Sequence, residues 1–70
     1  MGGKSIAHTL GKRIREERSR KGISQIKLSM GAGLSANYIS DIERGTRDVK
    51  ISTIERIAQV LGVPPGTLLM

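Results

Sequence analysis

Apolar residues recur along this chain at the spacing of α-helices, in short segments separated by glycines. In one segment, Ile54, Ile57, Ala58 and Leu61 stand at positions i, i+3, i+4 and i+7. This spacing places all four side chains on one face of a helix. The alternation of apolar and polar residues that is typical of a half-buried strand does not compete with it. The pattern therefore predicts an all-α protein.

Hydroxyl residues that can cap a helix precede these segments, and glycines that can end a helix follow them. In chain order, the predicted helices are 10–21 after Thr9, 25–32 after Ser24, 35–44 from Ser35, a helix that ends before Gly62 and opens with the capping box Ser52–Glu55, and a last turn at Pro64 and Pro65. We therefore expect a compact domain of five short helices over residues 9–70. Residues 1–8 are expected to form a flexible N-terminal arm.

The second and third predicted helices have the spacing of a helix-turn-helix motif. Gly33 stands at the turn, where a positive φ is needed. Ser29 is small where the two helices approach most closely. Apolar residues occupy the positions that hold the two helices crossed: Leu28, Ala32, Leu34, Ile39 and Ile42.

The net charge of the chain indicates which class of binding partner to expect. Twelve Lys and Arg against six Asp and Glu give 70 residues a formal net charge of +6. A basic domain of this size is typical of nucleic-acid binding, although solubility alone is an alternative explanation. Tyr38 is the one aromatic residue, which disfavours base stacking on single strands. The absence of cysteine and of any apolar run of membrane length favours a soluble cytoplasmic protein with no membrane partner.

The segment SQIKLSMGAGLSANYISDIERGTR, residues 24–47, resembles the Cro/C1-type (lambda-repressor-like, XRE) helix-turn-helix family. The resemblance extends over about residues 10–69. It implies a five-helix DNA-binding domain, a homodimer, and a recognition helix in the major groove of an operator, in a bacterium or phage. Within the family, ERGTRDVKISTIERIAQVLGV is similar to the controller proteins of restriction–modification systems.

One side of the third predicted helix can read bases. At 100° per residue, Ile39 and Ile42 share one side, and a small polar set gathers on the other. An Asn amide can pair with an adenine edge, an Asp carboxylate can accept from a cytosine amino group, and an Ala methyl can touch a thymine methyl. The alternative is that these residues are merely solvated. The predicted base-reading residues are Ala36, Asn37, Ser40 and Asp41.

Phosphate contacts are predicted around the same helix. The family resemblance implies that Gln25 and Ser35, at helix starts, donate to phosphates, which the helix N-terminal charge also favours. Arg44, Arg47 and Lys50 stand at the end of the helix and in the following loop, and the Tyr38 hydroxyl can add a contact. For each of them, solvation without a DNA contact is the alternative.

Arg18 has a different predicted role. Leu10 and Ile14 define an apolar stripe at spacing four, and Arg18 is its next member. An arginine that faces the core needs an acidic partner. The family pairs this position with that of Glu43, so we expect a structural ion pair between the first helix and the recognition helix.

These observations predict a sequence-specific transcriptional regulator, such as a repressor, that binds double-stranded DNA. One short reading helix covers few base pairs, so we expect a homodimer on a near-palindromic operator, located at the nucleoid when bound. The apolar C-terminal segment is the predicted dimer interface, with a core role as an equal alternative for Leu68: Val63, Leu68, Leu69 and Met70.

Other functions are less well supported. An antitoxin-like or co-regulator module that mainly holds another protein is the principal alternative, and a nonspecific DNA-coating protein is a weaker one. No catalytic residue set emerges, so an enzyme is not expected. His8 is the one histidine and cysteine is lacking, so no metal site or cofactor is predicted. No small-molecule effector is evident.

Overall fold

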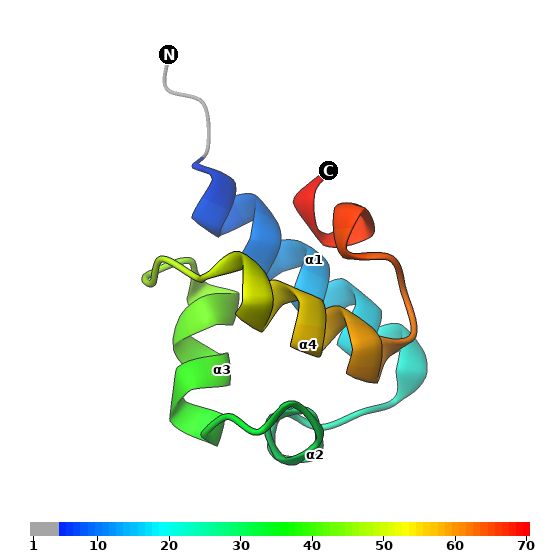
Figure 1. The fold of residues 1–70 in the computed structure, drawn as a ribbon. Coiled ribbons are helices and arrows are strands. Elements are labelled where there is room, and N and C mark those ends of the chain that lie inside the picture. The colour runs from blue at the N-terminus through cyan, green and yellow to red at the C-terminus, as the bar shows by residue number, and fades with distance from the viewer. Residues whose placement is uncertain (1–4) are drawn as a thin grey trace.

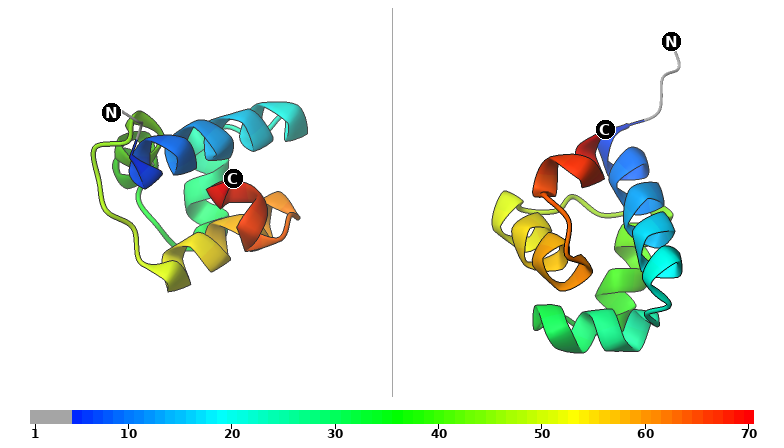
Figure 2. Two further views of the ribbon diagram at one scale, coloured as in Figure 1. Left: turned by 90° about the horizontal axis from the view of Figure 1, so that it is seen from above. Right: turned by 90° about the vertical axis from the view of Figure 1, so that its right-hand side faces the viewer.

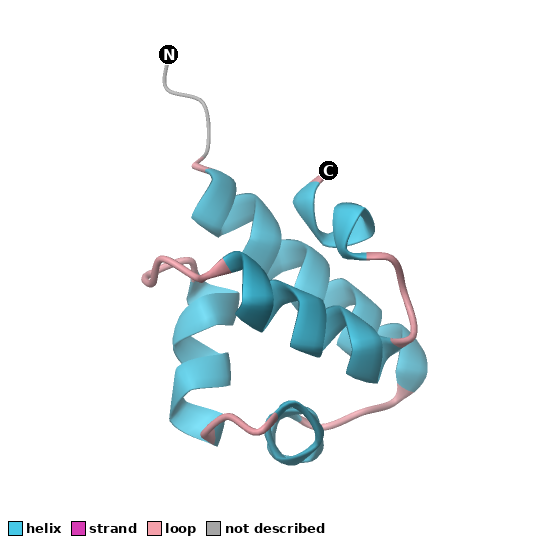
Figure 3. Cartoon of the chain, in the orientation of Figure 1, coloured by secondary structure: helices cyan, strands magenta, loops and turns pink. Residues whose placement is uncertain are grey.

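The computed structural model describes residues 5–70, and these form helices joined by short loops, without strands (Figure 3). Four of the elements are α-helices, and the predicted fifth is a short 3₁₀ helix. The elements are α1 (Ile6–Lys21), α2 (Gln25–Ala32), α3 (Ala36–Arg44), α4 (Ile51–Leu61) and the 3₁₀ helix η1 (Pro65–Leu69). The all-α prediction is confirmed, and the prediction of five α-helices is corrected to four. No helix within residues 5–70 is long and apolar enough to cross a membrane.

In Figure 1, α4 lies in front of α1, and in the right-hand view of Figure 2 these two helices lie on opposite sides while α2 and α3 close the lower end. In Figure 1, α2 is seen end-on and α3 runs steeply up the left side, so these two consecutive helices cross at a large angle. The C-terminal η1 returns toward α1 and α4, as the two turned views show (Figure 2). The element that the sequence predicts as the reader, α3, is therefore at the edge of the molecule.

The first helix begins four residues earlier than predicted. Ser5, not Thr9, is the N-cap, and its Oγ accepts a hydrogen bond from the His8 backbone N–H at 3.1 Å. Both hydroxyls suit a cap, and tertiary contact explains the choice. A Cβ built on Gly45, in the loop after α3, would lie 3.0 Å from the His8 Cα, so this loop packs directly against the first turn. Of the predicted arm, residues 6–8 are helical and residues 1–4 lie outside the described residues.

The predicted capping box at the start of α4 is also wrong. Lys50 is the N-cap, with φ −68° and ψ 149°, and its side chain makes no capping hydrogen bond. Its carbonyl oxygen accepts from the backbone N–H groups of Thr53 and Ile54, at 3.0 Å each. Ser52 therefore lies inside the first turn, where it cannot act as the cap.

One apolar core holds all five elements together. It contains four of the five predicted apolar residues of the helix-turn-helix, with Ile39 fully buried and Ile42 almost so, while the partly buried Leu34 packs against it. Leu68 from η1 also belongs to the core. Leu68 has no exposed surface, so it is removed from the predicted dimer interface. The complete core set is Leu10, Ile14, Leu28, Ala32, Ile39, Ile42, Ile54, Ile57, Ala58, Leu61 and Leu68.

Candidate DNA interface

A largely buried polar cluster fixes α3, the predicted reading helix, to the rest of the domain. The Arg18 guanidinium of α1 donates to both carboxylate oxygens of Glu43 on α3, from Nε at 2.7 Å and from Nη2 at 3.0 Å. Gln25 of α2 donates from Nε2 to Glu43 Oε1, also at 3.0 Å. The Glu43 side chain is only 4% exposed and that of Arg18 is 17% exposed. The structure thus contains the predicted ion pair, and one carboxylate joins all three helices.

Arg18 keeps its positive charge within this cluster. Hydrogen bonding to the Glu43 carboxylate raises the pKa of Arg18 above its ordinary value, although burial acts in the opposite direction. A raised pKa on a base means that its stabilising contribution is complete below the ordinary value and is lost only at still higher pH. Arg18 therefore stays protonated under all physiological conditions. Its remaining donor, Nη1, bonds to the Ile23 carbonyl oxygen at 3.0 Å, which ties it to the loop before α2.

The predicted base-reading residues share the side of α3 that faces away from the core. Ile39 and Ile42 point inward, and Asn37 is exposed near the N-terminal end of the helix. Ala36, Ser40 and Asp41 are half-buried. Asn37 is thus the most exposed of the four predicted base-reading residues.

Asp41 is engaged with two arginines. Its Oδ1 accepts a hydrogen bond from Arg44 Nη2, one turn along α3. Its Oδ2 lies 3.4 Å from Nε of Arg47, in the loop after the helix. The Arg47 guanidinium also lies over the Tyr38 ring, 5.2 Å from its centroid. Four of the residues predicted to contact DNA are therefore already in contact with one another.

Other predicted phosphate contacts occupy different positions. Ser35 caps α3, its Oγ accepting from the Tyr38 backbone N–H at 3.1 Å. Lys50 is exposed at the start of α4. The Gln25 amide donates a hydrogen bond to Glu43, so its side chain joins α2 to the buried cluster, and its phosphate contact stays a prediction. Sequence reasoning missed this role because a glutamine at a helix start looks the same whether it faces DNA or a neighbouring helix.

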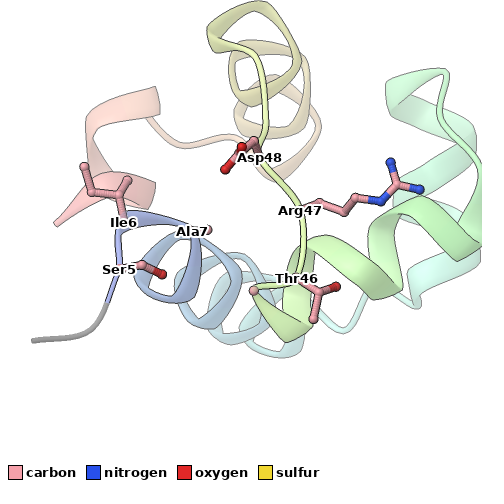
Figure 4. Close-up of a pocket in the computed structure, with 7 residues that line it drawn as sticks. Ser5, Ile6, Ala7, Thr46, Arg47 and Asp48 are labelled. Carbon is pink, nitrogen blue, oxygen red and sulfur yellow. The ribbon is translucent and has the colours of Figure 1, made fainter. Parts of the chain in front are cut away.

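A shallow depression lies between the first turn of α1 and the loop 45–48 (Figure 4). Ser5, Ile6 and Ala7 line one side of it, and Thr46 and Asp48 contribute from the loop. In Figure 4 the Arg47 side chain leaves this depression and extends over α3, whereas the Asp48 side chain points the other way. The side chains of Arg47 and Asp48, adjacent in the loop and opposite in charge, thus lie on different sides of the loop. Among residues 5–70, no group of three or more His, Asp or Glu residues could hold a metal ion.

The predicted dimer residues separate into two groups. Leu68 is in the core and the half-buried Val63 packs against it. Leu69 and Met70 are 40% and 73% exposed. The Met70 carbonyl oxygen accepts from Arg13 Nε of α1, which fixes the C-terminal segment against that helix. Ile6, in the first turn of α1, is a further apolar residue that is 74% exposed, and it fell in the presumed N-terminal arm.

Helices α2 and α3 cross each other, a glycine turn with φ of 70° at Gly33 joins them, and the second helix has an exposed polar face. These features define a helix-turn-helix protein. A helix-turn-helix family model matches residues 5–68. The chain belongs to this family, in its Cro/C1-type branch of DNA-binding transcription regulators, and its relatives are regulators, not enzymes.

Among curated relatives, the control protein C.BamHI of Bacillus amyloliquefaciens is 48% identical over 66 residues, 93% of this chain and 82% of that protein. The restriction–modification controller protein C.AhdI of Aeromonas hydrophila superposes with a TM-score of 0.86 at 37% identity, over 89% of this chain and 94% of that one. The biofilm regulator SinR, in a crystal structure with DNA, gives a TM-score of 0.83 at 37% identity, over 87% and 98%. The chain spans only 38–40% of the length of several other matched regulators.

Proposed function

We propose that this protein is a sequence-specific regulator of transcription that binds a near-palindromic DNA operator as a homodimer, with α3 in the major groove. The observation that carries the proposal is the anchoring of α3: a nearly buried carboxylate, Glu43, fixes it to α1 and α2 while its exposed side presents Asn37. A rigidly held helix with a small polar face suits a groove about 12 Å wide.

Charge and relatives support the same function. The formal net charge of +6 favours a polyanionic partner, and Arg44, Arg47 and Lys50 flank α3 where phosphates would lie. The crystal structure of the relative SinR contains DNA. The likeness to C.BamHI and C.AhdI favours a controller role next to a restriction–modification system. One α3 covers only a few base pairs, so two copies would read half-sites about one helical turn apart.

Selection of bound duplexes from a random pool tests this function. We expect a consensus with two-fold symmetry and a complex that contains two chains. The Asn37→Ala variant should lose about tenfold in preference for the consensus at one base pair per half-site, because an Asn–adenine pair discriminates by about 1–3 kcal/mol. Relative affinities for the consensus and its single-base variants measure this loss.

Gln59→Ala is the matched control, since it removes an exposed amide from α4 and not from α3. It should leave the preference unchanged. A wild-type protein that enriches no consensus would contradict the proposed function, and unchanged discrimination by Asn37→Ala would contradict the role of that residue.

The dimer contact is proposed at the C-terminal end, where Leu69 and Met70 are exposed beside α1. Leu69→Asp should shift the protein to a monomer in sedimentation experiments without DNA, because a charge there would be desolvated in the interface. Met30→Asp adds the same charge at a 77% exposed apolar residue of α2 and should leave association unchanged. A Leu69→Asp variant that still dimerises would place the interface elsewhere.

A further inference from the structure

The predicted DNA-binding arginines on α3 and in its following loop are both paired with one acidic residue in the protein alone. Asp41 offers one carboxylate oxygen to Arg44 Nη2 and the other to Arg47 Nε, the second at 3.4 Å. A carboxylate that binds two guanidinium groups presents the same kind of acceptor as a DNA phosphate. All three side chains keep access to water, with Arg44 and Arg47 more than half exposed.

Resting on the function proposed above, we propose that Asp41 is an internal phosphate mimic that restrains Arg44 and Arg47 and makes their transfer to DNA depend on base sequence. Either arginine must leave the carboxylate before it can bind a phosphate with full strength. Asp41 is then left beside the DNA and needs a new hydrogen-bond donor. In the major groove only the amino groups of cytosine and adenine can donate to it.

The consequence differs between operator and other DNA. Where an amino group lies opposite Asp41, the carboxylate exchanges two guanidinium partners for a base, and the arginines are released to the backbone. Where none does, the carboxylate stays near phosphates without a donor, and repulsion opposes binding. Asp41 therefore acts as a specificity-determining residue mainly by weakening binding to wrong sequences.

Tyr38 completes this arrangement. Its ring lies under the Arg47 guanidinium, at 5.2 Å from the ring centroid. This cation–π contact does not involve Asp41, so it can hold Arg47 over α3 after the ion pair has opened. Because Tyr38 also packs against the core, Arg47 is retained near the DNA backbone and does not disperse into solvent.

The experiment compares Asp41→Asn with Asp48→Asn in the full chain. Both variants remove one negative charge and nearly preserve side-chain shape. The Asp48 side chain points away from that of Arg47 (Figure 4), and no ion pair is found for it within residues 5–70. Affinities for a scrambled duplex and for the selected consensus are measured over a series of salt concentrations.

We expect Asp41→Asn to bind the scrambled duplex about fivefold more tightly, since two exposed ion pairs no longer oppose the transfer. Its salt dependence on that duplex should steepen by up to about two in the log–log slope, one for each arginine that gains a phosphate. Affinity for the consensus should not rise. Asp48→Asn should change scrambled-duplex binding by less than about twofold.

Two results would overturn the inference. Equal tightening by Asp48→Asn would show that only net charge matters, and no tightening by Asp41→Asn would show that Asp41 restrains nothing. Thermal melting of each variant verifies that it is folded before binding is measured. The scrambled-duplex comparison does not need a consensus, so it decides on the restraint even if the wild type shows no sequence preference, a result that would contradict the proposed function instead.

Discussion

Replacing Gly11 with alanine is expected to destabilise the protein by about 3 kcal/mol and to lower its melting temperature by about 15 °C. Gly11 is buried where α1 crosses α3. A Cβ there would overlap the Ile42 carbonyl oxygen and would lie 2.7 Å from the Glu43 carbonyl oxygen. Both obstacles are backbone atoms of α3, so no side-chain rotation can relieve the clash.

Two opposing contributions determine whether this substitution stabilises or destabilises the protein. In a solvated helix, glycine to alanine stabilises by about 1 kcal/mol, because alanine loses less backbone entropy. At Gly11 the two helices must move apart, and the loss of packing outweighs this gain. Gly66→Ala is the matched control, since no heavy atom lies within 4 Å of its added Cβ. Thermal denaturation followed by circular dichroism measures both variants, and an unchanged melting temperature for Gly11→Ala would refute the close approach.

Replacing Glu43 with alanine is expected to cost about 3 kcal/mol of folding stability and to weaken DNA binding about tenfold. The change removes the acceptor of three hydrogen bonds and leaves the Arg18 guanidinium, only 17% exposed, without its carboxylate. Breaking a buried ion pair from one side is costly because the remaining charge stays desolvated. DNA affinity should fall as well, because α3, the proposed reading helix, loses the contacts that hold it in place.

Two further variants serve as controls for the Glu43→Ala prediction. Glu55→Ala removes an exposed carboxylate from α4, with no ion pair found within residues 5–70, and should change neither property. Glu43→Gln retains the shape and one acceptor, so it should lie between the wild type and Glu43→Ala. Binding is measured at a temperature at which each variant is fully folded. Normal melting together with normal binding for Glu43→Ala would show that the cluster has no role in either.

Local sequence patterns predicted most helix ends correctly. Gly22, Gly33, Gly45 and Gly62 all take positive φ, between 67° and 75°, at the ends of helices. These ends are local because a left-handed residue and a capping hydroxyl act within one turn. Where two hydroxyls competed, as Ser5 and Thr9 did, the sequence could not decide. The loop around Gly45, which packs on the first turn of α1, favoured the earlier cap.

The sequence by itself determined that this protein is helical, that it carries a helix-turn-helix, and which side of α3 faces outward. These properties depend on periodicity and on short-range hydrogen bonds, which the order of residues encodes directly. Only the tertiary structure decided that Gln25 bonds to Glu43 and that Leu68 lies in the core. A polar side chain or a terminal leucine takes its role from what lies opposite it, and those partners are brought close only when distant segments pack together. Glu43 bonds to Gln25, 18 residues away, and Leu68 of η1 packs in the core with residues of all four α-helices.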